Sequence, residues 1–199
     1  MKNIIENSLK NSCSYLEYRK KVSDLLAEGK ASGNEQSEDL LHYSQLNEVR
    51  MNRLDKTIVV PEEVKQQLQL NSKYIWLVLA EGWCGDAAQL LPIMEKMTEV
   101  VPNIDLRIVF RDENDALMQE FLTNGARSVP KLIILNVENH EVLAAWGPRP
   151  EAAARLIKEY KTKFGVVNEE AKTELQKWYL HDKGLSTMAE IVKIMQAFG

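Results

Sequence analysis

The stretch from Tyr74 to Leu91, YIWLVLAEGWCGDAAQLL, constrains the fold of this chain more than any other segment. It opens with an unbroken apolar run over Tyr74–Ala80, which is typical of a strand buried on both faces of a sheet. After a short turn, apolar residues recur three or four positions apart, as they do along a helix. Cys84 therefore lies where a buried strand passes into a helix. Backbone N–H groups and the helix dipole stabilise a thiolate at such a position, so we expect the pKa of this thiol to be lowered.

The residues around this cysteine resemble the thioredoxin superfamily, in which a strand ends in Trp-Cys-Gly-Pro-Cys and the nucleophilic cysteine caps the next helix. The matching residues are Trp83, Cys84 and Gly85. A second segment, residues 127–135, resembles the part of the family in which a cis proline precedes a central strand and faces the active cysteine. The resemblance implies a cis bond between Val129 and Pro130, with the backbone of Val129 presented to an extended substrate.

The chain departs from the family pattern at three positions. Asp86 replaces the proline of the motif, and Ala87 replaces the second, resolving cysteine, so a self-contained dithiol is excluded at this site. The family's reductases also carry a buried acid on the strand, and the corresponding residue here is Val78. Together with the phrases RDEN and WGPRP, the Trp-Cys-Gly-Asp-Ala motif resembles a bacterial thioredoxin-like group, whose membership does not itself assign a substrate.

The resemblance implies an α/β fold of the thioredoxin-like kind, with a central mixed sheet flanked by helices. We expect three parts: an N-terminal helical extension packed on the core (1–60), the thioredoxin-like domain (61–165) and a C-terminal helical extension (166–199). Helical periodicity and caps predict helices at 15–26, 37–56, 61–70 and 150–164, and two more within 169–197. A further helix is predicted from 87 through at least 94, and another through 122 with Asp112 or Asn114 as its cap. Besides the strand of the motif, strands are predicted at 57–60, 104–110, 131–137 and 141–146, the last two as a hairpin.

Composition places the 199-residue chain among ordinary globular proteins, with 45% apolar and 27% charged residues. A formal net charge of −4 argues against nucleic acid as a partner, because no basic surplus exists to neutralise phosphates. No apolar run approaches the length of a membrane helix or of a secretory leader, which favours a cytoplasmic protein without membrane partners. Such a reducing compartment would keep Cys13 and Cys84, the two cysteines, as thiols.

Two further residues are candidates for the substrate groove. Trp146 and Arg149 belong to the loop after the last predicted strand, which the resemblance brings against the cysteine and the proline. With Arg127 and Lys131, Arg149 would supply positive charge for an anionic ligand such as a glutathione-like thiol, although ordinary surface positions explain each cation equally well.

The acidic residues beside the cysteine also leave two interpretations open. Asp86 and Glu81 would disfavour a thiolate by repulsion and raise its pKa. Asp86 serves equally well in a purely structural role, as a cap of the helix that follows.

No cofactor or metal site is predicted. The three histidines, His42, His140 and His181, lie in different predicted elements and show no ligand spacing with either cysteine. Cys13 lies in a polar stretch at the predicted start of the first helix, where we expect it to be exposed. Nothing in the pattern directs it to the cysteine loop, so we expect no disulfide between Cys13 and Cys84.

Two functions fit these observations. The first is a monothiol thiol–disulfide oxidoreductase that acts through Cys84 on mixed disulfides of a protein and a low-molecular-weight thiol. The second is a binding or scaffold module that keeps the thioredoxin shape without redox turnover, as the missing cysteine at Ala87, the missing acid at Val78 and the long terminal helices suggest. The sequence leaves the substrate, the reductant and the oligomeric state open.

Overall fold

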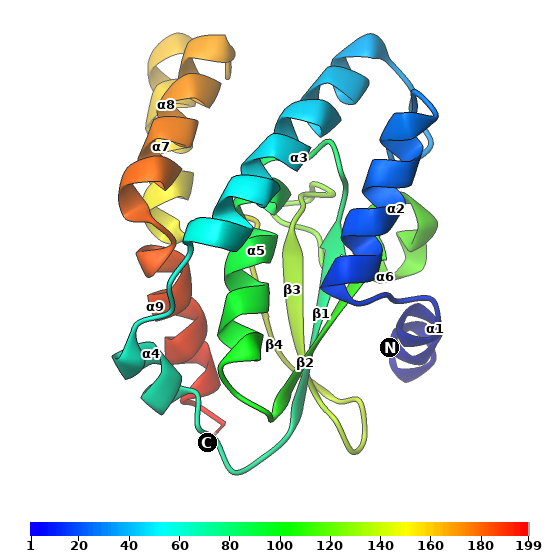
Figure 1. Cartoon of the computed structure of the whole chain (residues 1–199), viewed down its shortest axis with the longest axis vertical. Helices are drawn as coiled ribbons and strands as arrows, with labels where there is room; N and C mark the ends of the chain where they lie inside the picture. Colours follow the sequence, from blue (N-terminus) through cyan, green and yellow to red (C-terminus); the bar gives the residue numbers. More distant parts are fainter. Residues whose placement is uncertain (199) are drawn as a thin grey trace.

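A four-stranded mixed sheet forms the centre of the computed structural model, which describes residues 1–198 (Figure 1). The strands are β1 (Tyr74–Ala80), β2 (Ile104–Phe110), β3 (Lys131–Asn136) and β4 (Val142–Trp146), in the spatial order β2-β1-β3-β4. All seven residues of β1 are buried, as its continuous apolar run predicts. The α/β thioredoxin-like fold class is therefore confirmed in its central sheet.

Strand register places the cysteine at one end of the sheet. β1 runs parallel to β2 and antiparallel to β3, and Val78 at its centre lies between Ile108 and Leu132. β3 and β4 form the expected antiparallel hairpin, with an irregularity between Ile134 and Leu135. The carboxyl end of β1 and the start of β3 thus meet at the same edge of the sheet, which is where the two family motifs come together.

The helices form layers around this sheet, with α5 packed between the sheet and a second layer that contains α3 and α9 (Figure 1). On the other side of the molecule α1 packs against α6 beside β2. The helices are α1 (Lys2–Lys10), α2 (Tyr15–Ala27), α3 (Glu38–Thr57), α4 (Glu62–Gln67), α5 (Gly85–Glu99), α6 (Asp115–Glu120), α7 (Glu151–Phe164), α8 (Glu169–Asp182) and α9 (Leu185–Met195), with a 3-10 turn η1 (Arg111–Glu113) before α6.

Several helix ends follow from local sequence. Ser14 and Glu17 form a reciprocal capping box at the start of α2, and the side chains of Ser37 and Asn168 cap α3 and α8. α8 ends at Lys183 in the left-handed conformation, followed by Gly184 at φ 83°. This turn is the predicted break between the last two helices.

Three expectations for the N-terminal third were wrong. The segment 57–60 is not a strand, because α3 extends to Thr57 and the N–H of Ile58 still donates to the carbonyl of Leu54, away from any sheet edge. Residues 2–10 form α1, which was not predicted. Cys13 is buried rather than exposed, at 4%, because its backbone pairs with Ile108 on the outer edge of β2.

The C-terminal helices complete the hydrophobic core. In α9, Met188, Ile191 and Met195 are fully buried, and the helix packs against α5. Tyr179 of α8 is buried as well, at 5%. None of the helices in residues 1–198 is both long enough and apolar enough to cross a lipid bilayer.

Candidate functional site

Cys84 is the N-cap residue of α5, as the sequence predicts, with its backbone in an extended conformation. Its sulfur accepts a hydrogen bond from the N–H of Ala87 at 3.4 Å and donates one to the carbonyl of Val129 at 3.2 Å. The bond between Val129 and Pro130 is cis, which is the geometry that the family motif implies. The cysteine and the proline segment, which are 45 positions apart, therefore lie in direct contact.

Burial decides the protonation state of this sulfur. Cys84 is 8% exposed, and burial first, then the negative charge of Asp86, raise its pKa to about 12. The backbone N–H groups of Ala87 and Asp86 and the charge of Arg149 act in the opposite direction. The helix terminus is present as expected, but loss of solvation outweighs it, so Cys84 is a thiol at neutral pH.

Asp86 links three elements above the cysteine. One carboxylate oxygen pairs with the guanidinium of Arg149 at 2.6 Å, and the other accepts a hydrogen bond from the hydroxyl of Tyr179 at 2.8 Å. Arg149 follows β4 and Tyr179 belongs to α8. Asp86 therefore does not cap α5, and the charge of Arg149 is used within the protein rather than offered to a ligand.

Helices α3 and α8 line the cysteine loop at Gly85. A Cβ atom at this glycine would lie 3.5 Å from a guanidinium nitrogen of Arg50 and 3.6 Å from the amide nitrogen of Gln176. On the same side, the amide of Asn47 donates to the carbonyl of Gly82 at 2.9 Å. α3 and α8 thus cover one side of the cysteine loop.

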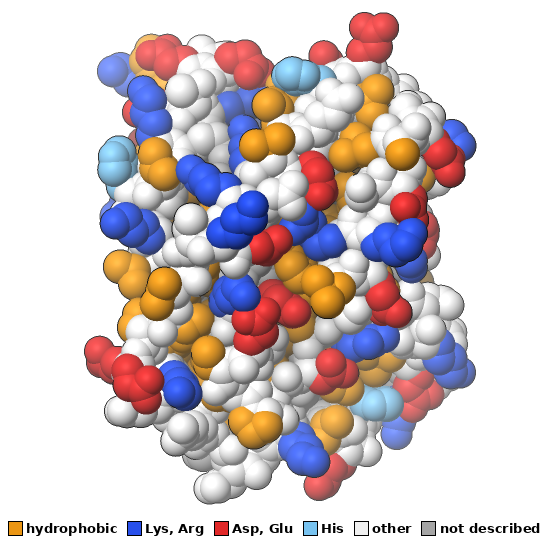
Figure 2. All heavy atoms as spheres, viewed as in Figure 1, with side chains coloured by type: hydrophobic (Ala, Val, Ile, Leu, Met, Phe, Trp, Pro, Cys, Tyr) orange, Lys and Arg blue, Asp and Glu red, His pale blue; other side chains and the backbone are white. Residues whose placement is uncertain are grey.

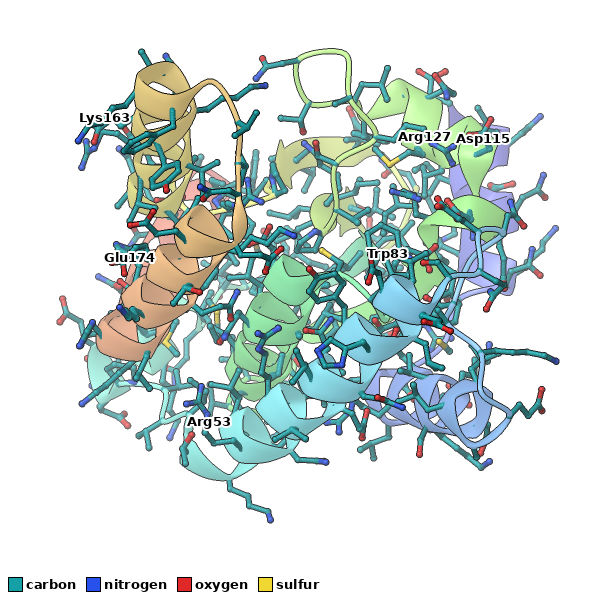
Figure 3. All side chains as sticks on the ribbon, turned by 90° about the horizontal axis from the view of Figure 1, so that it is seen from above. Arg53, Trp83, Asp115, Arg127, Lys163 and Glu174 are labelled. Atoms are coloured by element: carbon teal, nitrogen blue, oxygen red, sulfur yellow. The ribbon has the colours of Figure 1, made fainter. Side chains whose placement is uncertain are left out.

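The residues before the cysteine, Glu81 and Trp83, contact residues of two segments outside the sheet strands. The carboxylate of Glu81 is fully buried and accepts hydrogen bonds from the hydroxyl of Ser32 and from the N–H of Asp112. Burial raises its pKa. The guanidinium of Arg111 lies 4.8 Å from the centre of the ring of the half-buried Trp83, which Figure 3 labels.

Trp146 contacts α9 through its indole ring. It is 8% exposed, and its indole N–H donates to Glu190 at 2.8 Å. The neighbouring Gly147 has φ 107°, and a Cβ there would lie 2.6 Å from the carbonyl oxygen of Pro130. Only glycine permits this approach of the two loops.

The other predicted cations are also engaged. Arg127 pairs with Asp115 at 3.1 Å, and Figure 3 shows the two side by side at one edge of the molecule. Lys131 is buried, and its ammonium group donates to the hydroxyl of Thr123 and to the carbonyl of Gly147. Burial lowers the pKa of Lys131. Together with the Asp86 ion pair, these contacts show that the three predicted cations, Arg127, Lys131 and Arg149, are all engaged within the protein.

Sequence reasoning missed four residues of the site: Asn47, Arg50, Gln176 and Tyr179. They lie far along the chain from the cysteine motif, on helices that were assigned to packing. Helical periodicity indicates that Tyr179 faces inward, but no local signal says that it faces Asp86. Within the described part of the chain, no group of three or more histidine, cysteine or acidic side chains is placed to hold a metal ion.

Comparison with known proteins defines the class and then the family. A sequence model of the family described as thioredoxin matches residues 33–161, which is more than half of the chain. The chain therefore belongs to the thioredoxin family. The match begins before α3, so this helix lies within the family's span. No curated protein matches the sequence.

Two solved structures share the fold. One is a protein of unknown function, PA1234 from Pseudomonas aeruginosa, with a TM-score of 0.58 and 17% identity over 77% of this chain and 86% of that one. The other is an HIV epitope scaffold, with a TM-score of 0.59 and 19% identity over 93% of this chain and 99% of that one. At these identities the likeness concerns the fold alone.

Proposed function

We propose that this member of the thioredoxin family is a binding module in which Cys84 does not turn over in thiol–disulfide exchange. The observation that carries the proposal is the enclosure of the Cys84 sulfur, which has a pKa of about 12 and donates its proton to the carbonyl of Val129. A thiolate, not a thiol, is the nucleophile of disulfide exchange. With its pKa raised this far above neutrality, the sulfur is protonated at pH 7.

The surroundings of the sulfur support the same proposal. A resolving thiol is missing at Ala87, and the other cysteine, Cys13, is buried at the edge of β2. The Asp86–Arg149 ion pair and the hydroxyl of Tyr179 also enclose the start of α5 beside Cys84. In a binding module, the contacts of the cysteine loop with α3 and α8 would hold these helices and α5 together as one rigid surface.

Monothiol exchange through Cys84 remains the second candidate, and the contact between its sulfur and the Val129–Pro130 segment favours it. In that reaction the Cys84 thiolate attacks the small-thiol sulfur of a mixed disulfide, and the protein thiolate leaves. A second small thiol then attacks the Cys84 adduct, which regenerates the thiolate and releases the small thiol as its disulfide. A protein or a low-molecular-weight thiol would be the partner.

The same proposal includes the cellular setting. We expect a cytoplasmic protein, because a reducing compartment keeps both free cysteines as thiols. Its net charge of −4 favours proteins or small molecules over nucleic acid and anionic membranes as partners.

Incubation with oxidised glutathione, followed by mass spectrometry, separates the two candidates. We expect no Cys84 adduct in native protein and rapid modification of both cysteines in denaturant. Wild-type protein and Cys84→Ser should recover the same partner from cell extract in equal amounts. A native Cys84 adduct that reduced glutathione removes catalytically would reject the binding proposal and establish exchange.

A further inference from the structure

Two neighbouring hollows of about 540 and 350 Å³ lie between α3 and α8, and Arg53 and Leu180 line both of them. We call the pair the α3–α8 groove and define it by Val49, Arg50 and Arg53 on α3, and by Gln176, Leu180 and Lys183 at α8. At the other end of the two helices, the hydroxyl of Tyr43 on α3 donates a hydrogen bond to Glu169 of α8 and accepts one from Lys172. These contacts close that end of the groove.

The groove gathers exposed apolar side chains. Among residues 1–198, eleven large hydrophobic side chains are exposed, and Val49, Val59, Leu180 and Leu185 are four of them, with exposures from 52 to 77%. All four line the same groove. Contiguous exposed apolar surface of this kind marks an interaction site in a folded protein, whereas isolated exposed residues do not.

The rim of the groove is basic. Arg50, Arg53 and Lys183 belong to none of the ion pairs formed among the described residues, and Lys177 pairs with the exposed Glu174. Arg50 and Arg53 are three positions apart on α3, so they are neighbours on the helix surface, and both line the smaller hollow. Asp86, a buried carboxylate whose charge acts on Arg50, is already paired with Arg149. Figure 2 shows basic side chains among hydrophobic ones on this face of the molecule.

We propose that the α3–α8 groove binds an acidic amphipathic helix of a partner protein. The inference rests on the proposed binding function and names its surface. The length of α8 between Thr173 and Lys183 corresponds to about 15 Å, or three turns of a bound helix. Apolar residues three and four positions apart on that helix would fill the floor, and its acidic residues would meet Arg50, Arg53 and Lys183. Arg50 also lies against Gly85, so the bound helix would sit beside the cysteine loop.

Other occupants fit these features less well. A flat anionic membrane would reach the basic rim, but a groove recessed between two helices does not present its apolar residues to a flat surface. A second copy of this chain would have to offer an acidic apolar helix. The exposed face of α7 is basic in its last turn, with Lys161 and Lys163.

Peptide binding tests the assignment. The probes are two labelled helical peptides of about 14 residues with the same apolar face, one with glutamate and one with lysine on the polar face. By fluorescence anisotropy we expect the glutamate peptide to bind at least about tenfold more tightly, with an affinity that falls as salt is added. The double variant Arg53→Glu, Lys183→Glu should weaken binding by about tenfold or more.

The matched control is Lys161→Glu, Lys163→Glu on α7, which changes the net charge equally at exposed positions; Figure 3 shows Lys163 well apart from Arg53. This control should bind within about twofold of wild type. Equal binding of both peptides, or equal losses in both double variants, would overturn the proposal. So would preferential binding to phosphatidylglycerol vesicles, or a dimer that Arg53→Glu, Lys183→Glu dissociates.

The two proposals fail in different ways. If neither peptide binds and Cys84 stays unreactive, the assignment of the α3–α8 groove is rejected, while a binding function through another surface is retained. If the glutamate peptide binds and Cys84 turns over, the groove assignment is retained and the proposal of a binding module without thiol exchange is rejected.

Discussion

At Cys84 two opposing effects act on one sulfur atom. The first turn of α5 offers it the N–H groups of Asp86 and Ala87, and a helix N-terminus stabilises a negative charge by about 0.3–2 kcal/mol. Burial can shift a pKa by as much as about 3–5 units, and each unit corresponds to about 1.4 kcal/mol. Burial is the larger effect, so Cys84 is protonated although its position in the sequence is typical of a reactive cysteine.

Charge substitutions at the ion pair should move the reactivity of Cys84 in opposite directions. In Asp86→Asn the carboxylate that raises the thiol pKa is gone and Arg149 is left to lower it, so alkylation by iodoacetamide at pH 8 should be faster by on the order of tenfold. Arg149→Gln should slow it. Rates are measured by mass spectrometry in a Cys13→Ser background. Unchanged rates in both variants, with native circular dichroism, would show that these charges do not control the thiol.

The raised pKa also predicts a loss of stability in alkali. Unfolded Cys84 releases its proton near pH 9.0, whereas the folded protein retains it to about pH 12. The unfolded state is therefore favoured progressively across this window, by up to about 1.4 kcal/mol per pH unit. Urea unfolding from pH 8 to 10.5 should show a steeper decline for wild type than for Cys84→Ser, in which all tyrosines and lysines are unchanged. Parallel declines would contradict the assignment.

At the scale of elements, hydrogen bonds connect the loop before α3 to the residues that follow β1. The carboxylate of Glu81 lies inside the protein and accepts a hydrogen bond from the hydroxyl of Ser32. The oxygen of that hydroxyl in turn accepts a hydrogen bond from the N–H of Gly82 at 2.8 Å. A buried acceptor without its donor costs about 1–3 kcal/mol. The N-terminal region and the cysteine turn are thus coupled through one carboxylate.

Ser32→Ala should consequently lower the free energy of unfolding by about 1–3 kcal/mol, because it leaves both Glu81 and the Gly82 N–H short of a partner. Denaturant titration measures the loss. The matched control is Ser23→Ala on α2, an exposed serine, which should change stability by less than about 0.5 kcal/mol. Equal effects of the two substitutions would argue against the coupling.

Elements with strong local signals were predictable, and contacts between distant elements were not. The apolar run of β1, the hairpin of β3 and β4, and the N-cap position of Cys84 all follow from short-range pattern. The segment 57–60 reads as a strand by composition, but a strand also needs an edge to pair with, and this one follows directly on α3. Tyr179 and Arg50 reach the site only through helix packing, which periodicity does not specify. The partition into 1–60, 61–165 and 166–199 remains a prediction.

For the whole molecule, the C-terminal helices contribute to one shared core. Met188, Ile191, Val192 and Met195 are at most 3% exposed, and burying a side chain of this size stabilises a protein by about 1.5–3 kcal/mol. Their sum is comparable with the total stability of a typical domain, about 5–15 kcal/mol.

A chain shortened to residues 1–165 should therefore lose cooperative unfolding and bind the dye ANS, because the face of α5 under α9 becomes exposed. In the full chain, Ile191→Ala should cost about 2–5 kcal/mol, whereas Leu180→Ala on the surface should cost little. A shortened chain with sharp near-ultraviolet circular dichroism and a cooperative transition would show that α8 and α9 are a separable addition.

The backbone pairing of Cys13 with Ile108 has a consequence for the colloidal behaviour of the protein. β2 is an outer strand of the sheet, and this pairing occupies hydrogen-bonding groups that would otherwise face outward. Unpaired outer strands are templates for joining sheets of different molecules. Proteolytic loss of the first 14 residues would uncover that edge, and light scattering should then rise with protein concentration while the intact chain stays monodisperse. We therefore expect the N-terminal segment to protect the protein against aggregation through this outer strand.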